Sequence, residues 1–305
     1  MKKVIVRLGN GLGNQLFTYA AAYSFAKKNN SKLYVDNESG FYKKRYKYEL
    51  HNFNISAGIA EVNNKFLGEI GKLKRRILIK FNNYFKNKFF LIESLDKEKL
   101  TYYQPDQFNI NFKEKIYFEG YFQTEKYYKS REEELIKELT FKKEIVEQHN
   151  KYIKQIVNSN SVSLHFRQDK FHIKDGFTDY KQMSLDFTKK NIEHAKKGVE
   201  YFDKVLNKPV YFLWCNKYDG LREYFPDDKF IFVDSNLHKD PAYDLYLISL
   251  CKNFILSPST FHYWGAYFSK TKNKICLSPN NNFNVSGYYG FSNNKDIKAD
   301  WWIEI

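Results

Sequence analysis

The sequence contains only three cysteines among its 305 residues, and they are too far apart to form a paired motif. Cys215, Cys251 and Cys276 show neither C-x-x-C spacing nor the Cys/His spacing of zinc ligands. This pattern supports neither a disulfide framework nor a structural zinc site, and it favours a reducing compartment. No Asp-x-Asp pair or His/carboxylate cluster is prominent, so we expect no metal and no other cofactor.

Long apolar runs are missing as well. No stretch approaches about 18 consecutive apolar residues, the length that crosses a bilayer as a helix. The apolar residues that follow Lys2 and Lys3 have the length of a strand and end at glycines, unlike a secretory signal. We therefore expect a cytoplasmic protein without a membrane span.

Acidic residues are few relative to basic ones, and the net charge is +15. This balance suggests an anionic partner: a nucleic acid, a membrane surface or a phosphorylated small molecule. No RRM, helix-turn-helix or zinc-finger pattern occurs, so we expect no nucleic-acid partner. A basic nucleic-acid-binding protein remains an alternative of a different class. The aromatic content of 19% accompanies abundant Lys and Asn, which an AT-rich genome explains without base stacking.

One basic stretch, residues 72–90, is rich in aliphatic and aromatic side chains. Its mixture of cations and apolar side chains suits a peripheral contact with the anionic inner membrane. An ordinary basic helix that covers a core explains the same pattern. The side chains concerned are Lys72, Lys74, Arg75, Arg76 and Lys80, interleaved with Ile77, Leu78, Ile79 and Phe81.

Short apolar strands alternate with helices along most of the chain. This alternation predicts an α/β protein with parallel sheets covered by helices on both faces. We expect two doubly wound, Rossmann-like domains, 1–157 and 158–305, that face a cleft. The expected strands are 4–8, 32–36, 161–167, 209–215, 229–234, 254–257 and 274–279, with a strand and loop in 115–123. The expected helices lie within 14–29, 124–157, 182–206, 240–253 and 260–268.

The first strand leads into a glycine-rich turn, GNGLGNQ, and then a helix. The turn lacks the third glycine of a dinucleotide fingerprint and the Lys of a phosphate-binding P-loop. Glycines at a helix N-terminus can cradle an anion or a polar ligand, because the backbone N–H groups there are free. A tight strand-to-helix turn without a ligand is the alternative. The candidate ligand contacts are Gly11, Gly13, Asn14 and Gln15.

Two segments of the second half also place polar groups where a parallel sheet binds its ligands, beyond the carboxyl ends of strands. His165 and Arg167 follow one strand, and an Arg guanidinium binds phosphate oxygens bidentately. Ser259 and Thr260 start a later helix, where hydroxyl and N–H groups suit a phosphate. The alternatives are a solvated Arg, a packed His and plain helix capping. Before the preceding helix, Asp240 is predicted as its N-cap and Pro241 as its first residue.

Together, these segments resemble the α-1,2-fucosyltransferase family, glycosyltransferase family 11. The family's opening G-G-x-G-N-Q-[LM]-F-x-Y-A corresponds to GNGLGNQLFTYA, with Asn10 for one glycine. Its H-x-R-R-x-D corresponds to HFRQDK, with Gln168 for the second Arg and one residue fewer before Asp169. Its third motif corresponds to DLYLISLCKNFILSPSTFHYWGA, where Pro258, His262 and Tyr263 replace Asn, Ser and Trp. The family's F-S-D-D-x-x-W is degraded here to LWCNKYDGL.

The resemblance implies a GT-B fold and an inverting transfer of L-fucose from GDP-fucose, without a required metal, to a galactose hydroxyl of a bacterial glycan. That acceptor can be lipid-linked. The first domain is then the acceptor side and the second binds the GDP-sugar. The departures leave open another GDP-sugar, another linkage, or an inactive carbohydrate-binding homologue.

The same resemblance suggests roles for individual residues. Arg167 would stabilise the departing diphosphate, and His165 and Asp169 are the candidates for a general base. The residues expected to bind substrate are Gly11, Gly13, Asn14 and Gln15 in the first half, and Asp244, Ser259, Thr260 and Phe261 in the second.

Overall fold

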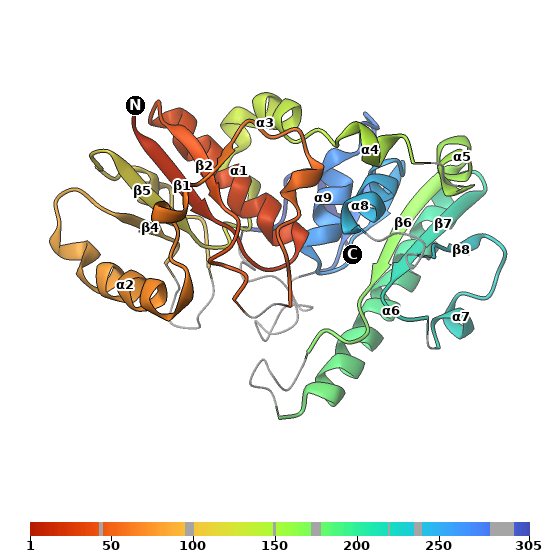
Figure 1. The fold of residues 1–305 in the computed structure, drawn as a ribbon. Coiled ribbons are helices and arrows are strands. Elements are labelled where there is room, and N and C mark those ends of the chain that lie inside the picture. The colour runs from red at the N-terminus through yellow and green to blue at the C-terminus, as the bar shows by residue number, and fades with distance from the viewer. Residues whose placement is uncertain are drawn as a thin grey trace. The chain divides into compact units, whose positions relative to one another are not determined.

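The computed structural model describes residues 1–42, 45–94, 101–148, 151–171, 178–218, 220–234, 240–280 and 296–305. These residues form two compact units, and each is described by itself (Figure 1). The first unit contains residues 1–142 and a short segment that includes 296–299, and the second contains the remainder.

The first unit is built on a parallel sheet whose strands lie in the order β3-β2-β1-β5-β4. The chain runs from β1 outward to β2 and β3, and later places β5 on the other side of β1. The order of the strands therefore reverses between β1 and β5. The strands are β1 Lys3–Arg7, β2 Lys32–Asp36, β3 Gly58–Ile59, β4 Phe90–Ile92 and β5 Lys115–Glu119.

Helix α1, Leu12–Lys28, is the central helix of this unit. Residues from Leu12 to Ala26, with the exception of Asn14, are buried, since apolar residues occur on all sides of the helix. The other α-helices are α2 Gly68–Phe81 and α3 Glu132–Glu138. Short 3₁₀ turns cover the connections at η1 Leu50–Asn52, η2 Val62–Asn64, η3 Asn82–Tyr84, η4 Pro105–Phe108, η5 Glu125–Tyr127 and η6 Lys129–Arg131.

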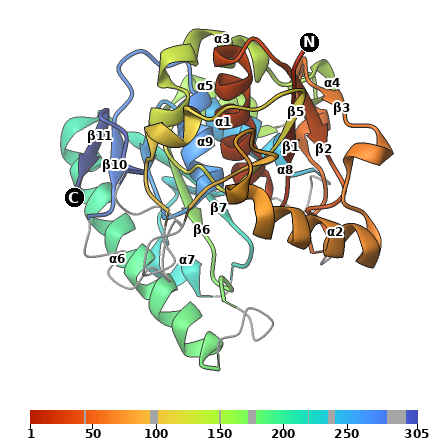
Figure 2. The ribbon, with the colours of Figure 1, turned by 90° about the vertical axis from the view of Figure 1, so that its left-hand side faces the viewer.

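The second unit has a parallel sheet in the order β11-β10-β9-β6-β7-β8. Figure 2 shows β10 and β11 side by side at one edge. The strand order reverses between β6 and β9, the two neighbours at the centre. The strands are β6 Asn160–Phe166, β7 Pro209–Cys215, β8 Phe230–Phe232, β9 Asn253–Ile255, β10 Cys276–Ser278 and β11 Trp302–Glu304.

The helices of the second unit pack on this sheet and on one another. The helix that follows β6 is the longest of the described chain, α6 Tyr180–Val205, and α8 packs against α9. Asp240 caps α8 by accepting a hydrogen bond from Ala242 N–H at 3.0 Å, and Pro241 is the first residue of the helix, as predicted. The others are α4 Lys143–Val146, α5 Lys151–Asn158, α7 Leu221–Tyr224, α8 Pro241–Ser249 and α9 Thr260–Phe268.

The boundary between the units falls between Lys142 and Lys143, not at 157/158 as expected. Helices α4 and α5 pack against α8 and therefore belong to the second unit. The Tyr152 hydroxyl of α5 donates to Phe232 O at 3.4 Å and accepts from Asp234 N–H at 3.2 Å. The sequence predicts the boundary too late because these helices precede their own sheet along the chain.

None of the helices in the described ranges is long and apolar enough to cross a membrane.

Candidate functional site

Each sheet has one place where the strand order reverses, and ligands of open parallel sheets bind beyond the carboxyl ends of the strands there. In the second unit this carboxyl edge of the sheet is formed by the ends of β6 and β9. In the first unit it is formed by the ends of β1 and β5. Candidate residues of the sequence lie at both edges.

His165 links the carboxyl ends of β6 and β9 in the second unit. It is the penultimate residue of β6, and its Nδ1 lies 3.3 Å from the Oγ of Ser257, which follows β9. Its ring centroid lies 5.9 Å from that of Phe261 and 5.6 Å from that of His262. The structure thus brings together two predicted residues, His165 and Phe261, and two others, Ser257 and His262.

His262 is completely buried and holds this group in place. Ser257 N–H donates to its Nδ1 at 3.3 Å, so the ring proton is on Nε2 and is donated to Ser163 Oγ at 2.9 Å. Burial lowers the pKa of His262 well below its usual value, so the ring is neutral. No role was predicted for this residue, and its departure from the family motif was the only signal in the sequence.

Arg167 lies one residue beyond β6 and is half-buried. Within the described ranges, its guanidinium forms no hydrogen bond or ion pair with another side chain. Burial and then Arg167 lower the pKa of His165 to about 4 and that of Lys170 to about 7. The Lys170 ammonium lies 4.3 Å from the centroid of the Phe187 ring. The Arg167 guanidinium at the end of β6 is therefore the cation that an anion can reach.

Asp169 lies on the side of β6 that faces β7. Its carboxylate accepts a hydrogen bond from the side-chain amide of Asn216, just after β7. The Oδ1 of Asn216 in turn accepts from Gln168 N–H at 2.9 Å. These contacts attach Asp169 to β7, whereas His165 contacts the residues after β9.

The start of α9 lies directly after β9. Ser259 caps this helix, since its Oγ accepts from His262 N–H at 3.4 Å, so the capping interpretation of Ser259 is confirmed. Thr260 is the first helical residue, and the N–H groups of a first helical turn have no acceptor within the helix. Asp244 lies half-buried in the first turn of α8, which packs against α9.

At the edge of the first unit, close backbone contacts explain part of the glycine-rich turn. A Cβ on Gly9 would lie 3.0 Å from Gly40 O, and one on Gly40 would lie 1.7 Å from Leu8 O. Asn10 has φ 62°, a left-handed conformation that Asn tolerates better than most residues. Gly11 is the extended N-cap of α1, and Gly13 is buried within the helix.

Gln15 is a structural residue rather than an exposed ligand contact. Its side chain is completely buried and donates to Asn10 O and to Lys47 O, both at 2.8 Å. Its Oε1 accepts from Glu49 N–H at 3.0 Å. Both N–H bonds of the amide are used within the protein, so Gln15 fixes the following loop against the turn, in contrast to the substrate contact expected for it.

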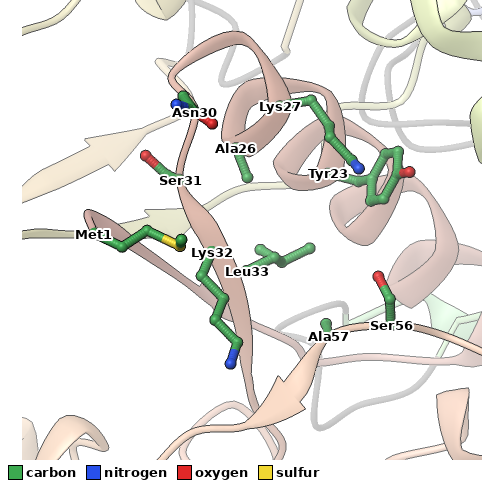
Figure 3. Close-up of a pocket in the computed structure, with 10 residues that line it drawn as sticks. All are labelled: Met1, Tyr23, Ala26, Lys27, Asn30, Ser31, Lys32, Leu33, Ser56 and Ala57. Atoms are coloured by element: carbon green, nitrogen blue, oxygen red, sulfur yellow. The ribbon is translucent and has the colours of Figure 1, made fainter.

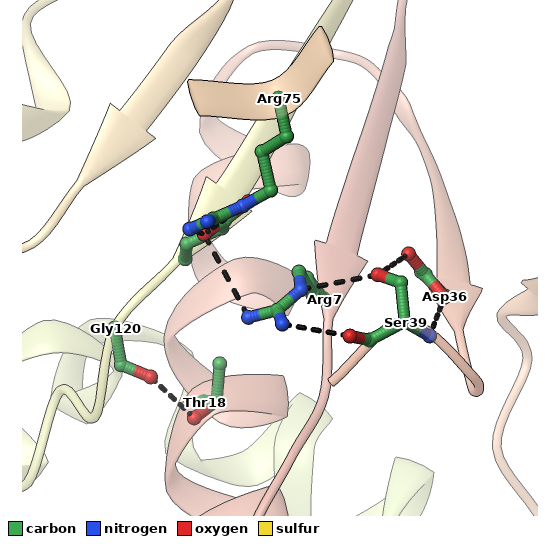
Figure 4. Close-up of polar contacts among 7 residues, drawn as sticks. Arg7, Thr18, Asp36, Ser39, Arg75 and Gly120 are labelled. Carbon is green, nitrogen blue, oxygen red and sulfur yellow. Dashed lines mark hydrogen bonds and ion pairs between the residues drawn. The ribbon is translucent and has the colours of Figure 1, made fainter. Parts of the chain in front are cut away.

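Asn14 links the start of α1, which follows β1, to the segment that follows β5. Its Oδ1 accepts from Gln123 Nε2 at 2.6 Å, and Gln123 follows β5. One turn later, Thr18 Oγ1 donates to Gly120 O at 2.9 Å, which fastens α1 to the same segment (Figure 4). In the described part of the chain, the side-chain N–H groups of Asn14 form no hydrogen bond, so they remain available to a ligand.

The charged groups beside this edge are occupied by protein partners (Figure 4). Arg7 donates to Ser39 Oγ at 3.0 Å and to Ser39 O at 2.7 Å. Glu119 accepts two hydrogen bonds from Arg75 Nε, at 2.8 and 3.0 Å, and a further one from its Nη2. Burial lowers the pKa of Arg7, while Glu119 opposes this shift. This network holds α2 against β5 and is not an open anion site.

A cavity of about 250 Å³ lies at the opposite end of the first sheet (Figure 3). Tyr23, Lys27 and Asn30, at the end of α1, form part of its wall, together with the start of β2. It is therefore remote from the carboxyl ends of the strands. Across the described ranges, no group of three or more His, Cys, Asp or Glu side chains could hold a metal ion.

The two α/β units have the fold of solved GT-B-like fucosyltransferases. A variant of Arabidopsis thaliana FUT1 in complex with GDP aligns with a TM-score of 0.54 and 13% identity, over 90% of this chain and 70% of that chain. POFUT1 in complex with GDP aligns with a TM-score of 0.50 and 13% identity, over 91% and 98%. The expected fold class is confirmed.

The chain belongs to glycosyl transferase family 11, whose family model matches residues 3–305, as its motifs indicated. Two Escherichia coli proteins are similar over almost the whole chain. The O-antigen biosynthesis glycosyltransferase WbnK is 24% identical over 98% of this chain and 99% of its own length. An alpha-1,2-colitosyltransferase is 26% identical over 92% of each. The protein is therefore a glycosyltransferase.

The buried histidines of the second unit predict a loss of stability in acid. His194 of α6 donates from Nε2 to Leu256 O at 3.0 Å, and burial lowers its pKa to about 4. Its folded pKa lies below the unfolded value, so its contribution is complete above pH ~6.5 and decreases as the pH falls toward 4, by roughly 3 kcal/mol in total. In His194→Gln, the free energy of unfolding should depend less steeply on pH, by up to about 1.4 kcal/mol per pH unit.

Urea denaturation at several pH values between 4 and 7 measures this slope. His51→Gln is the control, because it makes the same substitution at an exposed position. An unaltered slope in His194→Gln would mean that His194 has the same pKa in the folded and the unfolded protein, so that burial does not lower it.

Proposed function

We propose that the protein transfers L-fucose from GDP-fucose, with inversion, to a galactose hydroxyl of a bacterial glycan, in α-1,2 linkage. Family membership supports the transfer, and the similarity to WbnK supports an O-antigen-type acceptor, which can be lipid-linked. The GDP complexes of structures with the same fold support a GDP-sugar donor. The observation that carries the proposal is the half-buried Arg167, without a protein partner in the described chain, at the strand-order reversal of the second sheet.

In this proposal the donor diphosphate binds at the end of β6. Arg167 contacts the phosphate oxygens. Lys170, whose pKa is lowered to about 7, adds positive charge beside it because a bound anion favours the protonated ammonium. Thr260 and the first N–H groups of α9 provide further donors, because a helix N-terminus favours an anion. Phe261 and Ser259 also lie at the start of α9 and would border the bound diphosphate. Asp244, on the neighbouring helix, is the proposed contact for the nucleotide.

The chemistry follows from where charge develops. The bond from the sugar carbon to the phosphate oxygen breaks through an oxocarbenium-like transition state, and negative charge accumulates on the departing GDP. A guanidinium held in place before the reaction stabilises this charge more strongly in the transition state than in the ground state. The acceptor hydroxyl attacks the opposite face of the sugar carbon, which inverts the configuration.

A strong general base is not required if the acceptor proton leaves late in so dissociative a step. His165, with its pKa near 4, is neutral and weakly basic at pH 7. The Asp169 carboxylate is held by Asn216, away from the residues after β9. We therefore assign His165 to positioning the loop of Ser257. His165 and Asp169 are the candidates for a general base if one is needed.

The first unit is the proposed acceptor side. Asn14 offers its side-chain N–H groups at the end of β1, while Gln123 fixes its oxygen. Gly11 and Gly13 leave the backbone around this amide without side chains. These residues would orient the acceptor hydroxyl, and Gln15 would hold the loop that borders them.

A different sugar is the second candidate. The similarity to an alpha-1,2-colitosyltransferase, together with the altered motif residues Gln168, His262 and Tyr263, favours a related deoxysugar as an alternative to fucose. The nucleotide part of the proposed site is the same for any GDP-sugar.

Calorimetry with free nucleotides tests the donor class. We expect GDP to bind both with and without EDTA, because Arg167, Lys170 and the α9 N-terminus provide the positive charge. UDP should bind at least about tenfold more weakly, a difference of roughly 1.4 kcal/mol. Tight binding of UDP without binding of GDP would contradict the proposal. Transfer assays with GDP-fucose and other GDP-sugars, on galactose-terminated acceptors, then identify the sugar.

A further inference from the structure

Helix α2 presents an apolar stripe to solvent. Ile70, Leu73, Ile77 and Phe81 are 85%, 58%, 48% and 47% exposed, and none of the residues of α2 is buried. Their spacing of three or four residues places them on one face of the helix. A row of exposed apolar side chains on a helix whose other face is already packed indicates an interaction surface.

The opposite face of α2 holds the helix to the first unit. Leu78 and Ile79 pack on the cluster that includes Phe66 and Phe90. Arg75 is bound to Glu119 at the end of β5 (Figure 4). The sequence places Arg75, Leu78 and Ile79 among the candidate membrane residues. In the structure these side chains instead attach α2 to the rest of the first unit.

Positive charge lies beside the exposed stripe. Lys74, Arg76 and Lys80 belong to the same helix, and within the described ranges none of them forms an ion pair within 4 Å. The sequence from 70 to 89 contains no acidic residue. On this helix Lys72 forms an ion pair with Glu69 at 2.7 Å.

The same composition continues beyond the helix. Exposed aromatic side chains follow in two pairs, Phe81 with Tyr84 at 6.1 Å and Phe85 with Phe89 at 5.2 Å between centroids. Asn82 fixes this segment, since its Oδ1 accepts from Phe89 N–H at 2.9 Å. A cavity of about 330 Å³ adjoins it. Its wall contains the aromatic pair and four cations together with one amide and one carboxylate: Phe85, Phe89, Lys86, Lys88, Lys113, Lys115, Asn87 and Glu114.

We propose that the α2 surface, defined by Ile70, Leu73, Ile77 and Phe81 with Lys74, Arg76 and Lys80, binds the surface of an anionic lipid bilayer. Apolar side chains on a positively charged helix enter the boundary between head groups and acyl chains, while the cations contact anionic head groups. A second copy of the chain fits this surface poorly, because two such positive faces repel each other.

Vesicle sedimentation with the full chain tests this surface without any sugar substrate, so its outcome is independent of the proposed function. We expect binding to phosphatidylcholine vesicles that contain 30% phosphatidylglycerol, and little binding to pure phosphatidylcholine. The triple variant Lys74→Gln/Arg76→Gln/Lys80→Gln should bind on the order of 100-fold more weakly, given the typical contribution of each cation near a membrane. Leu73→Ser/Ile77→Ser should also weaken binding, although it leaves the charge unchanged.

The matched control is Lys181→Gln/Lys189→Gln/Lys204→Gln, which removes the same charge from exposed positions of α6. It should bind vesicles as the wild type does. Equal losses in the two triple variants, or no loss in Leu73→Ser/Ile77→Ser, would overturn the proposal in favour of unspecific adsorption. A dimer in sedimentation velocity that Leu73→Ser/Ile77→Ser converts to monomer would overturn it in favour of a second copy.

Discussion

Arg167→Ala is expected to lower kcat by roughly 100-fold or more, the order of magnitude seen when a preorganised donor to a transition-state charge is lost. In the described chain the guanidinium has no protein partner that its removal would leave buried and unpaired. The variant should therefore fold normally. Its KM for the donor should rise less than its kcat falls, because the charge on GDP is greatest in the transition state.

Arg167→Lys distinguishes charge from geometry. Lys keeps the positive charge but lacks the planar pair of donors, so we expect it to recover only a part of the lost activity. Lys189→Ala removes an exposed cation of α6 and should leave turnover unchanged. Folded Arg167→Ala protein with wild-type turnover would show that Arg167 is only a surface residue and that the diphosphate binds elsewhere.

Asn14→Ala should reduce sugar transfer by about 100-fold while the protein remains folded. The Asn14 amide is oriented by Gln123 and offers its N–H groups at the end of β1, and the loss of such a positioning contact misaligns the reacting groups. The loss of stability should be limited to about 1 kcal/mol, the usual contribution of a polar contact at the start of a helix.

The control for Asn14→Ala is Asn29→Ala at the other end of α1, where Nδ2 donates to Phe25 O at 2.9 Å. It removes a comparable amide contact from the same helix and should not change transfer. Activity and thermal melting are measured on the same preparations. If Asn14→Ala melts at a lower temperature yet transfers sugar at the wild-type rate, the residue serves only the architecture of the turn.

Local patterns in the sequence predicted most of the strands and helices of the second unit. The apolar runs before His165 and before Cys215 form adjacent parallel strands. Asp240 caps its helix as predicted, and Ser259 caps its helix in line with the alternative interpretation. These features depend on neighbouring residues, so a single sequence contains the information. The 3₁₀ turns of the first unit and the short strand β3 have no comparable periodicity, and the sequence did not predict them.

The sequence alone could not predict features that depend on contacts between distant residues. Gln15 was assigned to substrate because its partners, at Lys47 and Glu49, lie more than thirty positions away. His262 differs from the family motif, and its support of Ser257 through Ser163 becomes visible only when β6 and β9 are adjacent. The sequence also divided the chain too late, because the contacts of Tyr152 with β8 and Asp234 are not local.

A crystal structure of the protein with GDP tests the central claim most directly. The account predicts that the diphosphate oxygens lie within hydrogen-bond distance of the Arg167 guanidinium, next to Thr260 and the start of α9. A diphosphate bound instead at the glycine-rich turn before α1, with Arg167 still exposed to solvent, would contradict it.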